Sequence, residues 1–162
     1  MSSDQLDDRI QQFWSLARGR AKVGELDVVM GRSWGEAIAP PAWSFGASTE
    51  QADTLLDLVL TGRKTATSGL YEEYQRDGEP IPLEGDLSII VDGSGTPKVL
   101  VREAEVVTVP FGKITPAQAE AEGEGDLETW RETHRTFWQN RGYDVDDNTL
   151  VVWERFTVVY QV

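Results

Sequence analysis

The segment Gly62–Gly69, with the sequence GRKTATSG, combines residue types that could carry chemistry. It follows a helix-like apolar stretch that stops at Gly62, and it continues as an extended segment, so Lys64 should project from the bend. Because side chains alternate along a strand, Thr65 and Thr67 should share one face. A lysine beside hydroxyl groups could orient a phosphate, polarise a carbonyl or activate a threonine. The alternative is that Lys64 caps the helix and the threonines only favour a strand.

A second segment, Glu122–Asp126 with the sequence EGEGD, places three carboxylates in a tight corner between two predicted helices. Its glycines allow the backbone to turn sharply, and like charges held close together could raise a pKa into the range useful for acid–base work. Asp126 is better explained as the N-cap of the following helix. For Glu122 and Glu124 the sequence does not decide between a solvated side chain and a functional one. We predict no metal bound at this segment.

Two other features look chemical but are better explained as structural. Residues 144–148 imitate the start of a calcium loop, but Thr149 and Arg155 stand where such a loop needs glycine and glutamate. His134 is the single histidine of the sequence, so a histidine metal cluster and a serine triad lack their parts. We expect His134 to be a packed, hydrogen-bonded side chain on an apolar helix face.

Hydrophobic periodicity predicts the elements that must hold these segments. The expected helices are residues 4–18, residues 49–61, a short helix after the cap Thr115, and one that begins at the cap Asp126. Strand-like segments lie, in chain order, at residues 64–68, 87–92, 98–109 and 150–162. The middle two should form a hairpin across the turn signal at 92–95. Strands without regular βαβ alternation predict an α+β fold with a mainly antiparallel sheet or small barrel decorated by helices.

The last strand carries one charged residue on its more apolar face. Alternation places Glu154 on the same side as Val152 and Phe156. A carboxylate inside a sheet is tolerated only when it is paired or strongly hydrogen-bonded. We therefore expect Glu154 to be buried against a partner, either a basic side chain or backbone amides.

The composition limits the class of protein. A length of 162 residues fits one domain with a real core. The sequence has no cysteine, which excludes disulfides and thiolate chemistry and favours a reducing compartment, so we expect a cytoplasmic protein. The first residues do not resemble a signal peptide, and no stretch approaches the roughly 20 apolar residues that span a bilayer.

The net charge limits the class of ligand. It is −13, from 28 acidic against 15 basic residues, and such a field repels a long polyanion. A local basic group could still hold one nucleotide or the end of a short strand. The alternative is that the charge serves solubility alone.

The residues described above resemble those of ASCH domains, a branch of the PUA-like β-barrel group associated with RNA binding and with RNA or nucleoside chemistry. The matching runs are Trp43–Gly46, Ala52–Leu55, Leu58–Thr67, Glu84–Asp86, Glu122–Asp126, Glu154–Phe156 and Val158–Tyr160. Residues 43–162 are therefore assigned to the ASCH domain, and residues 1–42 to an added N-terminal helix and loop. The resemblance implies a small, mainly antiparallel barrel of the PUA-like type, decorated by helices.

In a bacterial branch of these proteins the resemblance implies amide hydrolysis of N4-acetylcytidine. That reaction uses a lysine, a threonine three residues later and a glutamate after a short helix. Lys64, Thr67 and Glu122 match these positions as catalytic residues, and Glu124 is a rival for the acid role. The implied reaction needs no metal and no other cofactor.

The expected ligand is a nucleoside, a nucleotide or a short single-stranded RNA, and neither a membrane nor an extended duplex is expected. Phe45 and Tyr71 could stack on a base. The residues expected to bind the substrate are Phe45, Arg63, Thr65, Tyr71, Glu124 and Arg155. Other ASCH proteins resemble ribonucleases or RNA binders, so a single-strand ribonuclease and a non-catalytic RNA-binding module are the alternatives to a nucleoside hydrolase.

Overall fold

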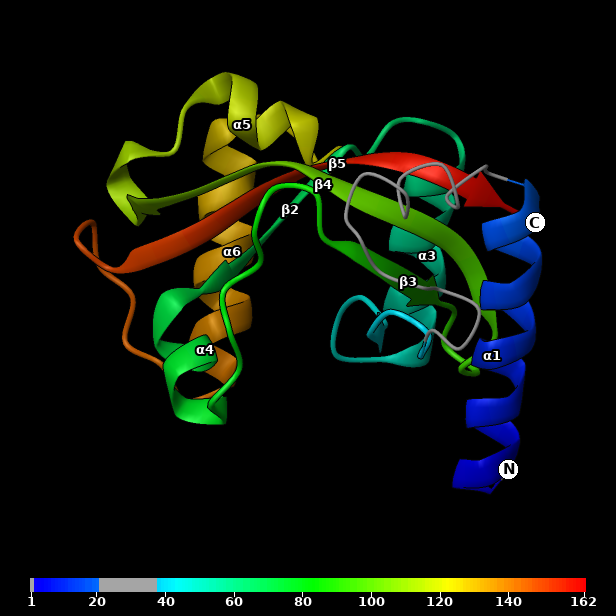
Figure 1. The fold of residues 1–162 in the computed structure, drawn as a ribbon. Coiled ribbons are helices and arrows are strands. Elements are labelled where there is room, and N and C mark those ends of the chain that lie inside the picture. The colour runs from blue at the N-terminus through cyan, green and yellow to red at the C-terminus, as the bar shows by residue number, and fades with distance from the viewer. Residues whose placement is uncertain (1, 21–37) are drawn as a thin grey trace. The chain divides into compact units, whose positions relative to one another are not determined.

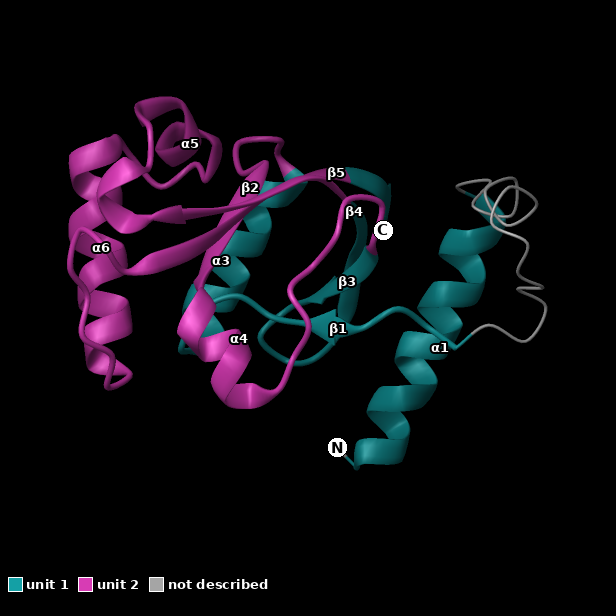
Figure 2. Ribbon diagram, turned by 60° about the vertical axis from the view of Figure 1, so that its left-hand side comes forward, with its two compact units in different colours: residues 1–60, 87–102, 158–162 teal, residues 61–86, 103–157 magenta. Residues whose placement is uncertain are grey.

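The computed structural model describes residues 2–20 and 38–162, and the structural statements below concern these ranges (Figure 1). Residues 21–37, which belong to the expected N-terminal extension, lie outside the described part. The chain divides into two compact units (Figure 2). Unit 1 comprises Met1–Leu60, Leu87–Arg102 and Val158–Val162, and unit 2 comprises Thr61–Asp86 and Glu103–Thr157. None of the helices in the described ranges has the length and apolar composition needed to cross a membrane.

Five strands of the described chain form one sheet with the order β1-β3-β4-β5-β2. Their bounds are β1 (Ala42–Trp43), β2 (Ala66–Leu70), β3 (Leu87–Val91), β4 (Pro97–Pro110) and β5 (Leu150–Gln161). β1 pairs with β3 in parallel, whereas the β3–β4 and β2–β5 pairs are antiparallel. The sheet has two free ends and does not close into a barrel. The α+β class is therefore confirmed, and the closed barrel implied by the resemblance is not.

Unit 1 contains two of the expected helices and the expected hairpin. Helix α1 (Ser3–Arg20) and helix α3 (Thr49–Leu60) lie close to their predicted bounds. β3 and β4 form the hairpin, which the Asp92 amide closes by donating to the Thr96 carbonyl over 2.9 Å. The buried cluster of this unit comprises Phe13, Trp14 and Ala17 of α1 with Ile89, Val91 and Leu100 of the hairpin strands. The apolar face of α1 is thus part of the core of unit 1.

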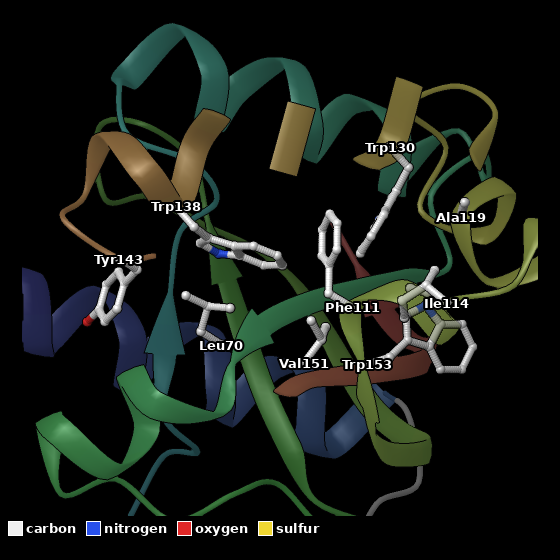
Figure 3. Packing of buried hydrophobic residues seen from close by; sticks show 10 residues of the cluster. Leu70, Phe111, Ile114, Ala119, Trp130, Trp138, Tyr143, Val151 and Trp153 are labelled. Carbon is white, nitrogen blue, oxygen red and sulfur yellow. The ribbon is translucent and has the colours of Figure 1, made fainter. Parts of the chain in front are cut away.

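Unit 2 holds the remaining helices around β2 and the first half of β5. They are α4 (Tyr71–Asp77), the 3-10 turn η2 (Phe111–Lys113), α5 (Pro116–Ala121) and α6 (Leu127–Asn140). Figure 3 shows Trp130 and Trp138 of α6 packed with Phe111 above Leu70 and Val151, all of them buried. The ring centroids of Phe111 and Trp130 are 5.4 Å apart. This aromatic cluster fixes α6 against the strands of unit 2.

The helix termini of unit 2 follow the predicted capping signals. The Thr115 hydroxyl and the Gln118 side chain form a complete capping box at the start of α5. The Asp126 carboxylate accepts a hydrogen bond from the Thr129 amide over 2.9 Å and caps α6, so both predicted caps are confirmed. Helix α4 was not anticipated, because none of its residues is fully buried and it carries no apolar periodicity.

Candidate functional site

Lys64 lies at the bend before β2 and is almost completely buried, with 2% of its surface exposed. Its ammonium group donates to Oε2 of Glu124 over 3.0 Å and to the backbone carbonyl of Glu122 over 3.1 Å. The backbone beside it is fixed as well, because the Thr65 amide donates to the Ala121 carbonyl over 2.8 Å. The bend and the acidic corner therefore meet in unit 2, as the sequence predicts for Lys64 and Glu122.

Gly123 makes this close contact sterically feasible. Its φ is +76°, a left-handed conformation that side chains disfavour. A Cβ atom at this position would lie 2.6 Å from the carbonyl oxygen of Arg63. A glycine is therefore required here for two reasons, the backbone conformation and the approach of the neighbouring chain.

The Glu122 side chain is fully buried and accepts several hydrogen bonds. Its Oε2 accepts from the Trp130 indole over 2.6 Å and from the Ser68 hydroxyl over 3.0 Å. Its Oε1 lies 3.3 Å from Nε2 of His134 and 3.9 Å from the Lys64 ammonium. Burial alone would raise the pKa of Glu122, but the hydrogen bond and charge of His134, the charge of Lys64 and the Trp130 indole together lower it below its ordinary value. Glu122 is thus held as an ionised carboxylate inside the protein.

His134 reaches Glu122 from helix α6. Its Nδ1 lies 2.8 Å from the Trp130 carbonyl, an acceptor, so Nδ1 carries a proton and Nε2 faces the Glu122 carboxylate. The imidazole also stacks on the Trp130 ring at a centroid distance of 4.3 Å. The prediction of a packed, hydrogen-bonded histidine is confirmed, and its contact with Glu122 makes it part of the site.

Glu124 differs from Glu122 in its access to solvent. Its side chain is 18% exposed, against 1% for the side chains of Lys64 and Glu122. It is also the carboxylate closest to the ammonium, at 3.0 Å. Of the two glutamates, Glu124 is the one that can meet a ligand without the buried network opening.

Glu122, Glu124 and His134 each offer one ligand atom within 4.8 Å of the others, which is compatible with metal ligation. However, the Lys64 ammonium already lies against both carboxylates. A divalent ion at this place would meet that positive charge in a buried setting, where repulsion is strong. In this arrangement Lys64 takes the role of the counter-ion.

The structure separates Thr67 from the groups around Glu122. In the β2–β5 pair Thr67 lies opposite Glu154, whereas Ser68, its neighbour on the other face, hydrogen-bonds to Glu122. Thr67 is half-buried, and its hydroxyl makes no hydrogen bond within residues 2–20 and 38–162. Lys64 and Glu122 thus converge as expected, while Thr67 points away from them.

The residues expected to bind substrate lie in different surroundings. Arg63 and Thr65 are exposed, and the Thr65 hydroxyl donates to the Ala121 carbonyl over 3.3 Å. Arg155 is also exposed and lies 3.5 Å from the Glu105 carboxylate. Tyr71 is half-buried at the start of α4.

Phe45 belongs to unit 1, whereas the other expected substrate-binding residues belong to unit 2. It is 5% exposed, and its ring meets that of Trp43 edge-on at a centroid distance of 4.7 Å. Its immediate role in the structure is packing within unit 1.

Glu154 is buried as predicted, with 5% of its surface exposed. The prediction of a basic or backbone partner is wrong. Its carboxylate accepts a hydrogen bond from the Tyr74 hydroxyl over 3.0 Å, and its other neighbour is the carboxyl group of Glu103.

Sequence reasoning missed three residues around Glu122, namely Ser68, Trp130 and His134. Strand alternation contained the signal for Ser68, because it follows Lys64 by four residues and so shares its face. Trp130 and His134 are four residues apart on α6 and therefore lie on one face of that helix. That face is also the core face of the helix, and nothing in the sequence distinguishes a core contact from a contact with a buried carboxylate.

Residues 41–160 match the family model of the ASCH domain. This chain belongs to the ASCH domain family. The ASCH domain structure from Lactobacillus crispatus JV V101 is 27% identical to it, with a TM-score of 0.70 over 88% of this chain and 96% of that one. Protein EF3133 from Enterococcus faecalis V583 is 28% identical, with a TM-score of 0.75 over 93% of this chain and 88% of that one. No curated protein matches the chain.

Proposed function

We propose that this ASCH domain hydrolyses an amide on a modified nucleoside, such as the acetyl amide of N4-acetylcytidine, without a metal. The observation that carries the proposal is the buried Lys64 ammonium, which is hydrogen-bonded to the partly exposed Glu124 carboxylate. A cation and a carboxylate in direct contact can stabilise a developing oxyanion and move a proton at the same place.

In the proposed reaction Lys64 polarises the acyl carbonyl and stabilises the negative charge on its oxygen. The Glu124 carboxylate takes a proton from the attacking water, whose oxygen forms the new bond to the acyl carbon. When the carbon–nitrogen bond breaks, the same carboxyl group gives the proton to the leaving amine. The products are the free carboxylic acid and the unmodified nucleoside, and no redox partner is needed.

Glu122 has a different role in this proposal. It is fully buried and its oxygens face Ser68, Trp130, His134 and Lys64. Such a carboxylate is suited to positioning the ammonium rather than to exchanging protons with a substrate. The proposal therefore assigns the acid–base role to Glu124 and the positioning role to Glu122.

Thr67 enters the proposal through the resemblance, which matches a threonine three residues after the lysine. The resemblance gives this threonine the role of nucleophile or water-orienting group, but the Thr67 side chain lies on the opposite face of β2 from Ser68 and Glu122, so the reaction proposed for Lys64 and Glu124 does not depend on it. Because its hydroxyl has no partner in the described chain, it is free to bind a substrate group. Its contribution is tested separately from that of Lys64.

The test uses the purified full chain with a panel of acylated nucleosides, followed by chromatographic separation of the products. We expect N4-acetylcytidine to be converted to cytidine, and we expect Lys64→Ala to lower the rate at least about 100-fold. A Thr67→Val variant, which keeps the shape of the side chain, shows whether the hydroxyl contributes. No turnover above that of the Lys64→Ala protein for any substrate of the panel would rule the proposal out.

A non-catalytic RNA reader is the second candidate, and the exposed position of Arg63 beside Lys64 favours it, because an exposed guanidinium can contact a phosphate. A protein with a net charge of −13 should then bind one base or a strand end with a shallow salt dependence. The same screen with short single-stranded RNAs measures both binding and cleavage. Binding without turnover supports the reader, and shortening of the RNA supports a ribonuclease.

A further inference from the structure

Unit 2 contains a second buried polar cluster, formed by Tyr74, Glu103 and Glu154, which the proposed reaction does not use. Glu103 is 6% exposed and Glu154 is 5% exposed. The Tyr74 hydroxyl donates to Oε1 of Glu154 over 3.0 Å. Thr67, whose hydroxyl is free in the described chain, lies directly opposite Glu154 in the β2–β5 pair. The cluster therefore adjoins the face of β2 that carries Thr67.

The hydrogen bonds of this cluster are incomplete. Oε2 of Glu103 is buried and has no hydrogen-bond partner within the described residues. Neither Glu103 nor Glu154 forms an ion pair with a lysine or arginine in those ranges. A buried acceptor without a donor is costly, and native proteins rarely leave one unless a water or a ligand supplies the missing donor.

The two carboxyl groups must share protons to remain buried together. Burial and the charge of Glu154 raise the pKa of Glu103 to about 8, and burial raises the pKa of Glu154 to about 7. Protonation of Glu103 allows its carboxyl group to donate a hydrogen bond to the neighbouring Glu154 carboxylate. The second oxygen of Glu103, Oε2, is then an acceptor without a donor. Asp86 adds negative charge near Glu103, and Glu122 adds negative charge near Glu154.

We propose that this cluster is a subsite for a nucleobase edge that presents N–H donors, in particular an exocyclic amino group. The buried Oε2 of Glu103 is an acceptor without a donor, and the Glu154 carboxylate beside it is a second acceptor, which matches the amino group of bases such as cytosine, guanine and adenine. The uracil edge presents one N–H between two carbonyl oxygens, and those oxygens would face the carboxylates unfavourably. The class of ligand rests on the proposed function, which makes the ligand a nucleoside.

The Tyr74 ring closes one side of this subsite. It lies against Gly69, where an added Cβ would come within 3.4 Å of the ring. Gly69 and Thr67 share one face of β2 by alternation. A base bound at the carboxyl pair would thus lie beside the threonine that the resemblance assigns to catalysis.

Wild-type protein tests the subsite directly through its selectivity at neutral pH. Calorimetric titration with cytidine, guanosine, adenosine and uridine should show binding of at least one amino-bearing nucleoside at least about tenfold tighter than that of uridine. Methylguanidine is the control ligand for charge and N–H donors alone. It is a small cation that carries N–H donors but no nucleobase ring, so a true base subsite should bind it more weakly than the preferred nucleoside. Equal affinity for all four nucleosides, no binding of any of them, or binding of methylguanidine as tight as that of the nucleosides would overturn the proposal.

Two matched variants locate the effect. Glu103→Gln preserves the shape of the side chain but puts an amide in place of the carboxyl group, and we expect it to reduce the preference for the amino-bearing base at least about fivefold. Glu105→Gln is the control, because Glu105 lies two residues away on β4 with a 44% exposed side chain. Unchanged selectivity in a folded Glu103→Gln protein, or the same loss in Glu105→Gln, would contradict the assignment. Turnover of N4-acetylcytidine, measured separately, reports on the proposed function and not on this subsite.

Discussion

The ammonium group of Lys64 lies 3.0 Å from the carboxylate of Glu124, although sixty positions separate the two residues in the chain. The contact depends on the corner at Gly123, which packs against the backbone of Arg63. Glu122, at the start of the same corner, anchors the ammonium from inside the core, while Glu124 remains partly open to solvent. Two acidic residues of one short segment therefore lie in different surroundings, one buried and one partly exposed.

Gly123→Ala should destabilise the protein by on the order of 2 kcal/mol or more, because it adds a Cβ against a backbone carbonyl in a left-handed conformation. Gly62→Ala is the matched control, since Gly62 has a φ of +79° but no atom within 4 Å of an added Cβ. We expect the control to cost only about 1 kcal/mol. Chemical denaturation of the two variants measures the difference, and equal losses would show that Gly123 does not carry the contact.

Glu122→Gln should cost more stability than Glu124→Gln. The buried Glu122 carboxylate accepts hydrogen bonds from Trp130 and Ser68 and pairs with His134. The NH2 group of a glutamine at this position would face one of these donors, so the substitution should cost about 3 kcal/mol. Glu124 is partly solvated, and its replacement should cost about 1 kcal/mol or less. The free energy of unfolding of the two variants is the measurement, and the reverse order would contradict the assigned roles.

Acid should weaken the protein through Glu122. Its pKa is lower in the folded protein than its ordinary value of 4.5, so the carboxylate contributes stability above that value. The contribution should be lost as the pH falls through the lowered folded pKa. Thermal unfolding of wild type and Glu122→Gln between pH 3 and pH 6 tests this, because the variant should lose less stability over the same range. Parallel curves for the two proteins would count against the buried carboxylate.

Alkali should weaken the protein through Glu103 and Glu154, for the opposite reason. Their pKa values are raised to about 8 and about 7, so the folded protein holds protons that the unfolded chain has already released above 4.5. Stability should therefore fall as the pH rises from about 5 to about 8. Glu103→Gln should flatten this slope, whereas Glu105→Gln should leave it unchanged. A melting temperature that does not change across this window would refute the raised pKa values of Glu103 and Glu154.

The sequence predicted local elements well because their signals are local. The apolar stripe of α3, the capping box of Thr115 and Gln118, and the turn at 92–95 all appear where periodicity and capping place them. The sequence does not predict helix α4, because none of its residues is fully buried and its apolar residues do not recur at helical spacing. Whether the sheet closes into a barrel also could not be predicted from the residues, because closure depends on pairing between strands that are distant in the chain.

The site was predictable only as far as strand alternation and family resemblance reach. Lys64 and Glu122 were expected to meet, and they do. Strand alternation places Ser68 on the same face as Lys64, whereas the resemblance points to Thr67 on the other face. The partners of Glu154 are a tyrosine from α4 and a glutamate from β4, and no spacing rule connects them with β5.

The most direct measurement for the proposed function is the kcat/KM for N4-acetylcytidine of wild type, Lys64→Ala and Glu124→Gln, each first shown to be folded by its thermal unfolding curve. If the Lys64–Glu124 pair performs the reaction, wild type converts the substrate to cytidine and both variants lose at least about 100-fold in kcat/KM. If Glu124→Gln keeps the wild-type kcat/KM, or if wild type releases no cytidine, the account of this pair as the reacting groups is wrong.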